Sequence, residues 1–243
     1  MNKSLGFICI YMSHTYLPFI DDVKLISAVS HVVSAFPQAD SVDIARNQLD
    51  PFGALFECVS FGYDMEAWKA SEVARQAQKT IQNRIGDFHQ KIFGAIKGCI
   101  DVPQGQGLDI LNEEESWCAE IKNKHNTTKG NHKPKLYDDI ALWVDRYSDS
   151  YSRPFIGYYV QIIPRKPTDF DQPFCPSDHG TRKPKREDIR EITAALLFDK
   201  ITGEKDSLKR LYLTLPRVFE DSFNKSTHLS KEQLITLFSM NIR

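Results

Sequence analysis

Two acidic residues and a lysine lie close together in the sequence, in an arrangement that suits metal-assisted hydrolysis. Residues 117–122 interleave apolar and charged side chains, which predicts a strand that carries Glu120 and Lys122 on the same face. Asp109 follows a glycine-containing turn and opens the preceding strand. A hairpin through residues 112–116 brings Asp109 to that same face, so that two carboxylates and one ammonium group converge.

The chemistry of this trio is that of a divalent cation and a water molecule. Magnesium ions take oxygen ligands from a few carboxylates and keep positions open for water and phosphate. A lysine beside such an ion holds or polarises the attacking water. We therefore expect Asp109 and Glu120 to bind Mg²⁺ and Lys122 to assist hydrolysis. The alternative is an edge strand with solvated charges, but the apolar strand and the glycine-flanked Asp109 favour a site.

A long helix upstream is the first element that must position the trio. Its apolar residues recur at helical spacing from Ala70 to Ile96, after a cap at Asp64, so one face is expected to be buried. The polar face offers accessory groups for the metal site, and a solvated helix surface is the alternative for each of them. These candidates are Asn83, Asp87 and Gln90.

The rest of the chain predicts helices and strands in mixed order. Helical spacing and capping residues predict further helices over residues 22–36, 51–59, 137–147, 187–200 and 230–238. Aromatic and β-branched residues predict strands over residues 155–163 and 211–215. The first of these strands is apolar almost throughout, which favours burial at the centre of a mixed sheet.

A basic loop begins directly after the predicted catalytic strand. Between Ile121 and Leu136 there are five lysines, two histidines and no acidic residue. Positive charge so close to the trio would hold the phosphates of a nucleic acid near the reacting group, whereas a solvated lysine loop is the alternative. The residues that we expect to contact phosphate are Lys124, Asn126, Lys129 and Lys133.

Residues 164–186 form the one long segment without a regular pattern. A loop of this length in a compact domain is usually functional or disordered. It contains five prolines and, near its end, four basic residues within residues 182–186. Because arginine reads guanine bidentately in the major groove, we interpret the segment as a DNA-facing insertion, with a flexible surface loop as the alternative. Its candidate contact residues are Arg165, Arg182, Lys183 and Arg186.

Length and composition favour one domain over residues 1–243 of ordinary globular character. Apolar residues make up 41% and the net charge is −1, which excludes a wholly basic nucleic-acid coat protein but allows local basic patches. The five cysteines are scattered without a Cys-x-x-Cys pair, which favours a reducing cytoplasm over a disulfide framework or a zinc site. The sequence shows neither a signal peptide nor an apolar run of membrane-spanning length, so no membrane partner is expected.

The order of a long helix, a glycine-flanked aspartate and an apolar strand with Glu-x-Lys resembles the PD-(D/E)XK nuclease core, with Leu108 in place of the proline. The block from Glu120 to Asn126, Glu-Ile-Lys-Asn-Lys-His-Asn, is similar to that of type II restriction endonucleases that cut GGNCC or GGWCC sites. Residues 82–90 and 159–164 also resemble that group, so the match covers about residues 50–220.

This resemblance implies an α/β fold in which helices flank a mixed central β-sheet. It implies a Mg²⁺-dependent endonuclease acting on double-stranded DNA, as a homodimer because the site is palindromic. Asp109 and Glu120 would be the metal ligands, joined by the backbone carbonyl of Ile121, and Lys122 the catalytic lysine. Two alternatives remain: a repair or junction-cleaving nuclease on the same core, and a DNA-binding protein without catalysis.

Overall fold

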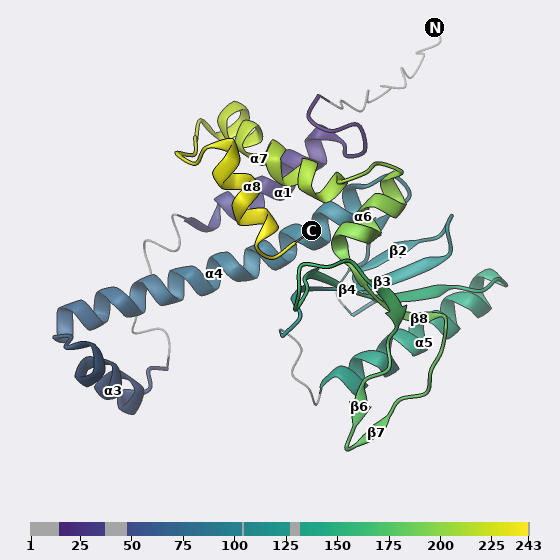
Figure 1. Cartoon of the computed structure of the whole chain (residues 1–243), viewed down its shortest axis with the longest axis horizontal. Coiled ribbons are helices and arrows are strands. Elements are labelled where there is room, and N and C mark those ends of the chain that lie inside the picture. Colours follow the sequence, from purple (N-terminus) through teal and green to yellow (C-terminus); the bar gives the residue numbers. More distant parts are fainter. Residues whose placement is uncertain (1–14, 37–47, 104, 127–131, 243) are drawn as a thin grey trace, which may run out of the picture.

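A mixed β-sheet of six strands organises the part of the chain that the computed structural model describes, residues 15–36, 48–103, 105–126 and 132–242. The strand order is β1-β2-β3-β4-β8-β5. Helices cover both faces of this sheet (Figure 1). The predicted α/β architecture, a mixed sheet flanked by helices, is therefore confirmed.

The sheet combines an antiparallel and a parallel part. Strands β1 (Ile100–Asp101), β2 (Ile110–Asn112) and β3 (Trp117–Lys124) run antiparallel to their neighbours in turn. Strands β3, β4 (Ile156–Ile163) and β8 (Ile189–Thr193) are parallel. Strand β5 (Asp171–Pro173) pairs antiparallel with β8 at the edge, and β6 (Ser177–Asp178) pairs with β7 (Thr181–Arg182) in a separate hairpin.

The two faces of the sheet are covered unequally. Helices α1 (Asp22–Val33), α4 (Met65–Ala95), α6 (Ala194–Thr202), α7 (Ser207–Phe223) and α8 (Lys231–Ser239) contribute to the larger apolar cluster on one face. Helix α5 (Lys133–Tyr151) packs alone among the described helices on the other face. Helix α3 (Pro51–Phe61) lies at the far end of α4, away from the sheet (Figure 1).

Capping side chains begin the helices where the sequence places them. The carboxylates of Asp21, Asp50 and Asp64 each accept a hydrogen bond from a backbone N–H in the first turn of α1, α3 and α4. Ser230 and Gln233 form a reciprocal capping box at the start of α8. These predicted helix starts are confirmed.

Alternation along the central strands separates the two cores. In β3, Ala119 and Ile121 belong to the larger cluster, whereas Cys118 faces α5. In β4, Val160 and Tyr159 are both fully buried but lie in different clusters. The predicted central position of the 155–163 strand is confirmed, because β4 lies between β3 and β8 and is covered on both faces.

Three secondary-structure predictions are wrong, and all three concern the chain after β4. The predicted helix over 187–200 is strand β8 followed by α6, because Ile189 and Ile192 point into opposite cores; their spacing is also compatible with a helix. The predicted strand over 211–215 lies inside α7, where Leu208, Leu211 and Val218 are buried at helical spacing. Residues 164–186 are not irregular throughout, since they contain β5, β6 and β7.

The buried face of the long helix is shorter than predicted. Its apolar residues enter the core from Phe88 onwards, whereas Ala70 near the start is exposed. The first half of α4 instead extends away from the sheet towards α3 (Figure 1). No helix among the described residues combines the length and apolar character required to cross a membrane.

Gly157 in β4 should be indispensable for packing α5 against the sheet. A Cβ atom there would lie 2.4 Å from Cγ2 of Ile140 and 2.6 Å from Cγ2 of Val144. We expect Gly157→Ala to lower the free energy of unfolding by about 1–3 kcal/mol, measured by urea titration, since overpacking displaces the helix. Gly86→Ala on α4, whose added Cβ meets nothing within 4 Å, is the control and should be neutral or stabilising. An equal response of both variants would contradict this packing argument.

Candidate active site

The hairpin of β2 and β3 brings the two predicted carboxylates side by side. Ile110 pairs with Ala119, so the register places Asp109, one residue earlier, opposite Glu120. The turn between the strands is closed by Ser116 with a φ of 57° and by the Asn112 side chain, which accepts the N–H of Glu115 at 2.9 Å. The predicted hairpin is therefore present, and its open end carries both acids.

The Asp109 side chain bonds to β3 just beyond the last backbone pair of β2 and β3. The Oδ2 atom of Asp109 accepts a hydrogen bond from the backbone N–H of Ile121 at 2.7 Å. Within a strand, the N–H and C=O of one residue point towards the same neighbour, as the paired bonds of an antiparallel ladder show. The Ile121 carbonyl therefore faces the side on which Asp109 lies.

Glu120 and Lys122 form a contact on the α5 side of the sheet. Oε1 of Glu120 lies 2.5 Å from Nζ of Lys122, and the two side chains are 20% and 30% exposed. This agrees with the alternation of β3, in which Cys118 faces the same side and Ile121 the opposite core. The lysine thus supplies a positive charge beside two acids while remaining accessible to a substrate.

Burial and like charge perturb the first of the two acids. Burial raises the pKa of the Asp109 carboxyl to about 6, and the negative charge of Glu120 acts in the same direction. The Ile121 N–H and the Lys122 ammonium oppose this rise but do not cancel it. A cation between the two carboxylates would remove the repulsion, so the electrostatics favour a bound positive charge.

The donor set fits a metal that shares its coordination with water and substrate. Among the described residues, no group of three or more His, Cys, Asp or Glu side chains is placed to hold an ion. Two carboxylates and a carbonyl therefore form an incomplete set. Such a set is what Mg²⁺ uses, because it keeps several waters and substrate phosphates as ligands.

Of the accessory groups predicted on α4, Gln90 has the most direct connection to the acids. Its Nε2 atom donates to Oδ1 of Asp101 on β1 at 2.7 Å, and the charge of Asp101 contributes to the raised pKa of Asp109. Asp87 instead contacts Nε2 of His31 at 2.9 Å, and Asn83, one turn further from the sheet, is exposed.

Asp101 is a neighbour of the site that the sequence analysis missed. It lies close to α4 because residue 94 is glycine: a Cβ there would lie 2.6 Å from the Cβ of Asp101. A strand of two residues gives no recognisable pattern, which is why β1 and its aspartate were not predicted. The pair of Gly94 and Asp101 is visible only in three dimensions.

A buried glutamine and a glutamate extend the polar face beside Lys122, and they were also missed. Gln161 on β4 pairs in register with Lys122 and is 5% exposed. Its Nε2 atom lies 3.3 Å from Oε2 of Glu191 on β8, whose other oxygen accepts from Gln172 at 2.7 Å. A lone polar residue within the apolar run 155–163 was the signal that could have identified Gln161.

Several residues predicted to contact phosphate lie near the C-terminal end of β3, just beyond Lys122. Lys124 ends β3 opposite Ile163, and Asn126 is exposed in the turn that follows. Arg165 is exposed just after β4, which is parallel to β3 and ends at the same edge. Lys133 is the first residue of α5, and Lys129 lies outside the described residues.

In the basic cluster at residues 182–186, Lys183 and Arg186 form salt bridges with carboxylates on α5, whereas Arg182 is exposed. Nζ of Lys183 contacts Asp138 on α5 at 2.8 Å. Arg186 lies between Asp145 on α5 and Asp188, at 2.6 and 2.8 Å, and these carboxylates raise the pKa of its guanidinium. Arg182 on β7 is exposed. Lys183 and Arg186 therefore attach the β6–β7 hairpin to α5, and Arg182 is the better candidate for contact with DNA.

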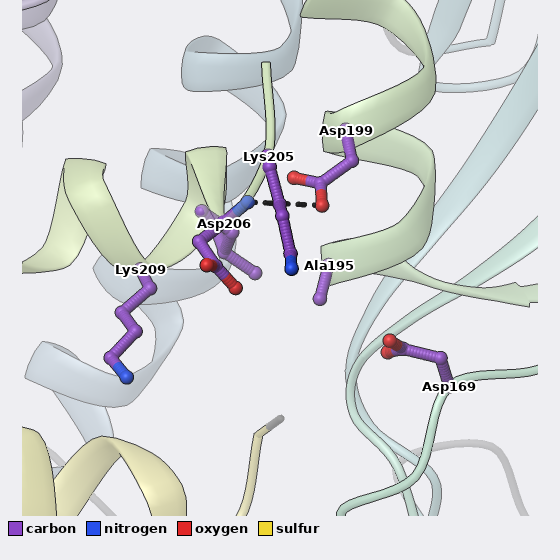
Figure 2. A pocket seen from close by; sticks show the side chains of 7 residues that line it. Asp169, Ala195, Asp199, Lys205, Asp206 and Lys209 are labelled. Atoms are coloured by element: carbon purple, nitrogen blue, oxygen red, sulfur yellow. Dashed lines mark hydrogen bonds between the residues drawn. The ribbon is translucent and has the colours of Figure 1, made fainter. Parts of the chain in front are cut away.

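A polar hollow of about 300 Å³ lies away from this trio, where α6 meets α7 (Figure 2). Its lining includes Asp169, Asp199 and Lys209. The Asp199 carboxylate accepts the backbone N–H of Asp206 at 3.0 Å and both the N–H and the hydroxyl of Ser207, at 2.9 and 2.7 Å. It thereby stabilises the start of α7, so this hollow has a structural explanation.

Comparison with known proteins identifies the family of the chain. The model of the Eco47II restriction endonuclease family matches residues 17–224. The type II restriction enzyme Eco47II of Escherichia coli is 40% identical over 211 residues, which cover 84% of this chain and 87% of that enzyme. The type II restriction enzyme Sau96I of Staphylococcus aureus is 31% identical over 219 residues, covering 86% and 82%. No solved structure matches the chain.

These matches decide between the three functions that the sequence left open. Both relatives are named as type II restriction enzymes, and each aligns over more than four fifths of the chain. The matched region contains the acidic pair, the lysine and the whole sheet. Enzymes of this class generally need a divalent metal ion, which the incomplete donor set of Asp109 and Glu120 accommodates. The chain therefore belongs to the Eco47II restriction endonuclease family and is a type II site-specific deoxyribonuclease.

Proposed function

We propose that the chain hydrolyses double-stranded DNA at a palindromic site of the GGNCC type, using Mg²⁺ held by Asp109 and Glu120. The observation that carries the proposal is the hydrogen bond from the Ile121 N–H to Asp109, which places one acid beside the other at the open end of a hairpin. Lys122 is in contact with the second acid. A short palindrome is read by two identical chains, so the active form is a homodimer.

Each member of the trio has a distinct role in this proposal. Asp109 and Glu120 bind the ion, with the Ile121 carbonyl facing the same side. The ion, when bound, lowers the pKa of a coordinated water and offsets negative charge on the scissile phosphate. Glu120 would hold the ion, and the Lys122 ammonium would donate a hydrogen bond to the attacking water. The products carry 5′-phosphate and 3′-hydroxyl ends.

The DNA contacts are proposed to lie at the end of the sheet where β3 and β4 terminate. Lys124, Asn126, Lys133 and Arg165 would hold phosphates next to the trio, and Lys129 lies outside the described residues. Residues 164–186 face the DNA, with Arg182 reading a base edge while Lys183 and Arg186 hold the hairpin on α5.

The proposed compartment is the cytoplasm. Cys58, Cys99, Cys118 and Cys175, the cysteines within the described residues, are free thiols. Burial raises the pKa of Cys99 and Cys118 to about 12, so these two thiols stay protonated and unreactive. Unpaired thiols suit a reducing compartment such as the cytoplasm.

Removing either Glu120 or Lys122 should abolish cleavage without abolishing DNA binding. We expect Glu120→Ala and Lys122→Ala to lower the single-turnover cleavage rate at least ~100-fold, because each removes a group that acts on the reacting phosphate or water. Cleavage is measured on a cognate plasmid with Mg²⁺, and binding by gel shift with Ca²⁺. Lys91→Ala, an exposed lysine on α4, is the control. Wild-type cutting by either variant would remove that residue from the mechanism.

The raised pKa of Asp109 predicts a pH-dependent cost in the metal-free protein. The pKa of Asp109 is about 6 in the folded protein and 3.8 in the unfolded chain, so the carboxyl group binds its proton more tightly in the folded state. The stability that this group contributes is present below pH ~4 and is lost as the pH rises through about 6. Asp109→Asn should therefore be more stable than wild type near pH 8, by up to about 3 kcal/mol, and similar near pH 4.

This comparison is made by urea unfolding of both proteins with a chelator present. Asparagine keeps a carbonyl oxygen for the Ile121 N–H, so the substitution removes charge without removing that contact. Equal stabilities of the two proteins near pH 8 would show that the buried charge at Asp109 carries no cost.

Arg182→Ala should weaken binding to the cognate site more than binding to random DNA. Loss of one bidentate base contact costs about 1–3 kcal/mol of cognate affinity. Arg165→Ala, in contrast, should weaken binding to both duplexes equally and reduce the salt dependence, as expected for a phosphate contact. Titrations of both duplexes at two salt concentrations measure these differences. An equal loss on random DNA would assign Arg182 to phosphate instead.

A further inference from the structure

Helix α3 carries its apolar side chains on the side that faces solvent. Phe52, Leu55, Phe56 and Val59 follow one another at positions i, i+3, i+4 and i+7, and they are 73%, 60%, 69% and 74% exposed. The residues between them, such as Ala54, Glu57 and Cys58, are half-buried. An ordinary surface helix turns its apolar stripe inwards, so this arrangement indicates a partner for the outer side. We call these four residues the apolar stripe.

The helix is held in place by contacts of its own. Asp50 caps the first turn, and Gly62, with a φ of 69°, ends the helix in the left-handed conformation. Nε1 of Trp68 on α4 donates to Oε2 of Glu57 at 3.1 Å, and Trp68 is buried. These contacts place the inner side of α3 on α4 and leave the apolar stripe exposed. Helix α3 itself lies at the end of α4 that is far from the sheet (Figure 1).

The apolar stripe exposes an area that suits a small protein interface. Phe52 and Phe56 are each about seven-tenths exposed, which is roughly 280 Å² of aromatic surface. Leu55 and Val59, at 60% and 74%, bring the total to the order of 500 Å². Two copies that pack stripe against stripe would bury about 1,000 Å² in total, which is the lower limit for a specific interface.

The charge on α3 favours a second copy of the same chain. Within residues 51–63 the one charged residue is Glu57, and its carboxylate is turned to Trp68. At a two-fold axis through the middle of the apolar stripe, no charged side chain therefore meets its own copy. A nucleic acid would find no positive charge on this surface, and a charged peptide would find no complement.

We propose that the apolar stripe of α3 is the surface through which two copies of this chain associate. The proposal rests on the homodimer that cleavage of a palindromic site requires, and it names the surface. Leu55 and Phe56, at the middle of the stripe, lie near the two-fold axis, and the outer side of α3 packs against the same helix of the partner.

The test compares the mass in solution of the full-length wild-type chain with that of a variant that carries a charge at the centre of the apolar stripe. Wild type should sediment at twice 27.9 kDa at micromolar concentration, without DNA or metal. Leu55→Glu should raise the dimer dissociation constant at least ~10-fold, because two like charges face each other across the axis. The matched control, Leu142→Glu, charges a 46% exposed leucine on α5 and should keep the wild-type mass. Circular dichroism confirms that each variant is folded.

A mixing experiment separates a lost contact from a damaged fold. Leu55→Glu and Leu55→Lys should each be monomeric, whereas an equimolar mixture should recover the dimer mass, since opposite charges then meet at the axis. A monomeric wild type, or a Leu55→Glu protein that keeps the dimer mass, overturns the proposal. The second result would also be seen if another segment of the same chain covered the stripe.

Cleavage assays keep this proposal distinct from the proposed function. A wild-type dimer that leaves a cognate plasmid intact with Mg²⁺ contradicts the nuclease mechanism and leaves the interface standing. A Leu55→Glu monomer should cut both strands at least ~10-fold more slowly at low concentration, and the mixture with Leu55→Lys should restore the rate. Full double-strand cutting by that monomer contradicts the role of the interface.

Discussion

The contact between the Asp109 carboxylate and the Ile121 N–H is the constraint on which the site depends. The Asp109 side chain takes the place of the next backbone hydrogen bond of the β2–β3 ladder, so that a half-buried acid is held opposite Glu120. The arrangement has an electrostatic cost, which is visible in the raised pKa of Asp109. The large core beneath β3 and the packing of α5 above it supply the stability that keeps this unfavourable pair in place.

The same hairpin explains why the sequence was informative about the site. Alternation in β3 and the distance from Asp109 to Glu120 are local properties, and a tight hairpin converts them directly into proximity. The capped starts of α1, α3, α4 and α8 are local as well, since one carboxylate or hydroxyl within a single turn defines each. The parts of the structure that depend on neighbours in sequence were therefore predictable.

The parts that failed depend on contacts between distant segments. Ile189 and Ile192 fit a helix by spacing, and only the two cores on either side of β8 determine that they belong to a strand. The approach of Asp101 to α4 depends on Gly94, and the partner of Lys122 on β4 is Gln161. Likewise, Lys183 and Arg186 each contact a carboxylate on α5, more than 40 residues earlier, and these contacts had no local signal in the sequence; Asp188, which also contacts Arg186, is near in sequence.

Helix α4 connects the two ends of the molecule as a single rod. Its 31 residues, at ~1.5 Å each, span roughly 46 Å from the base of α3 to the region of Gln90 and Asp101. With α3 as the proposed contact between two chains, the rod would set the distance and the relative angle between their two sites. One residue inserted midway would rotate α3 by ~100° relative to the sheet, so that the apolar stripe would face another direction.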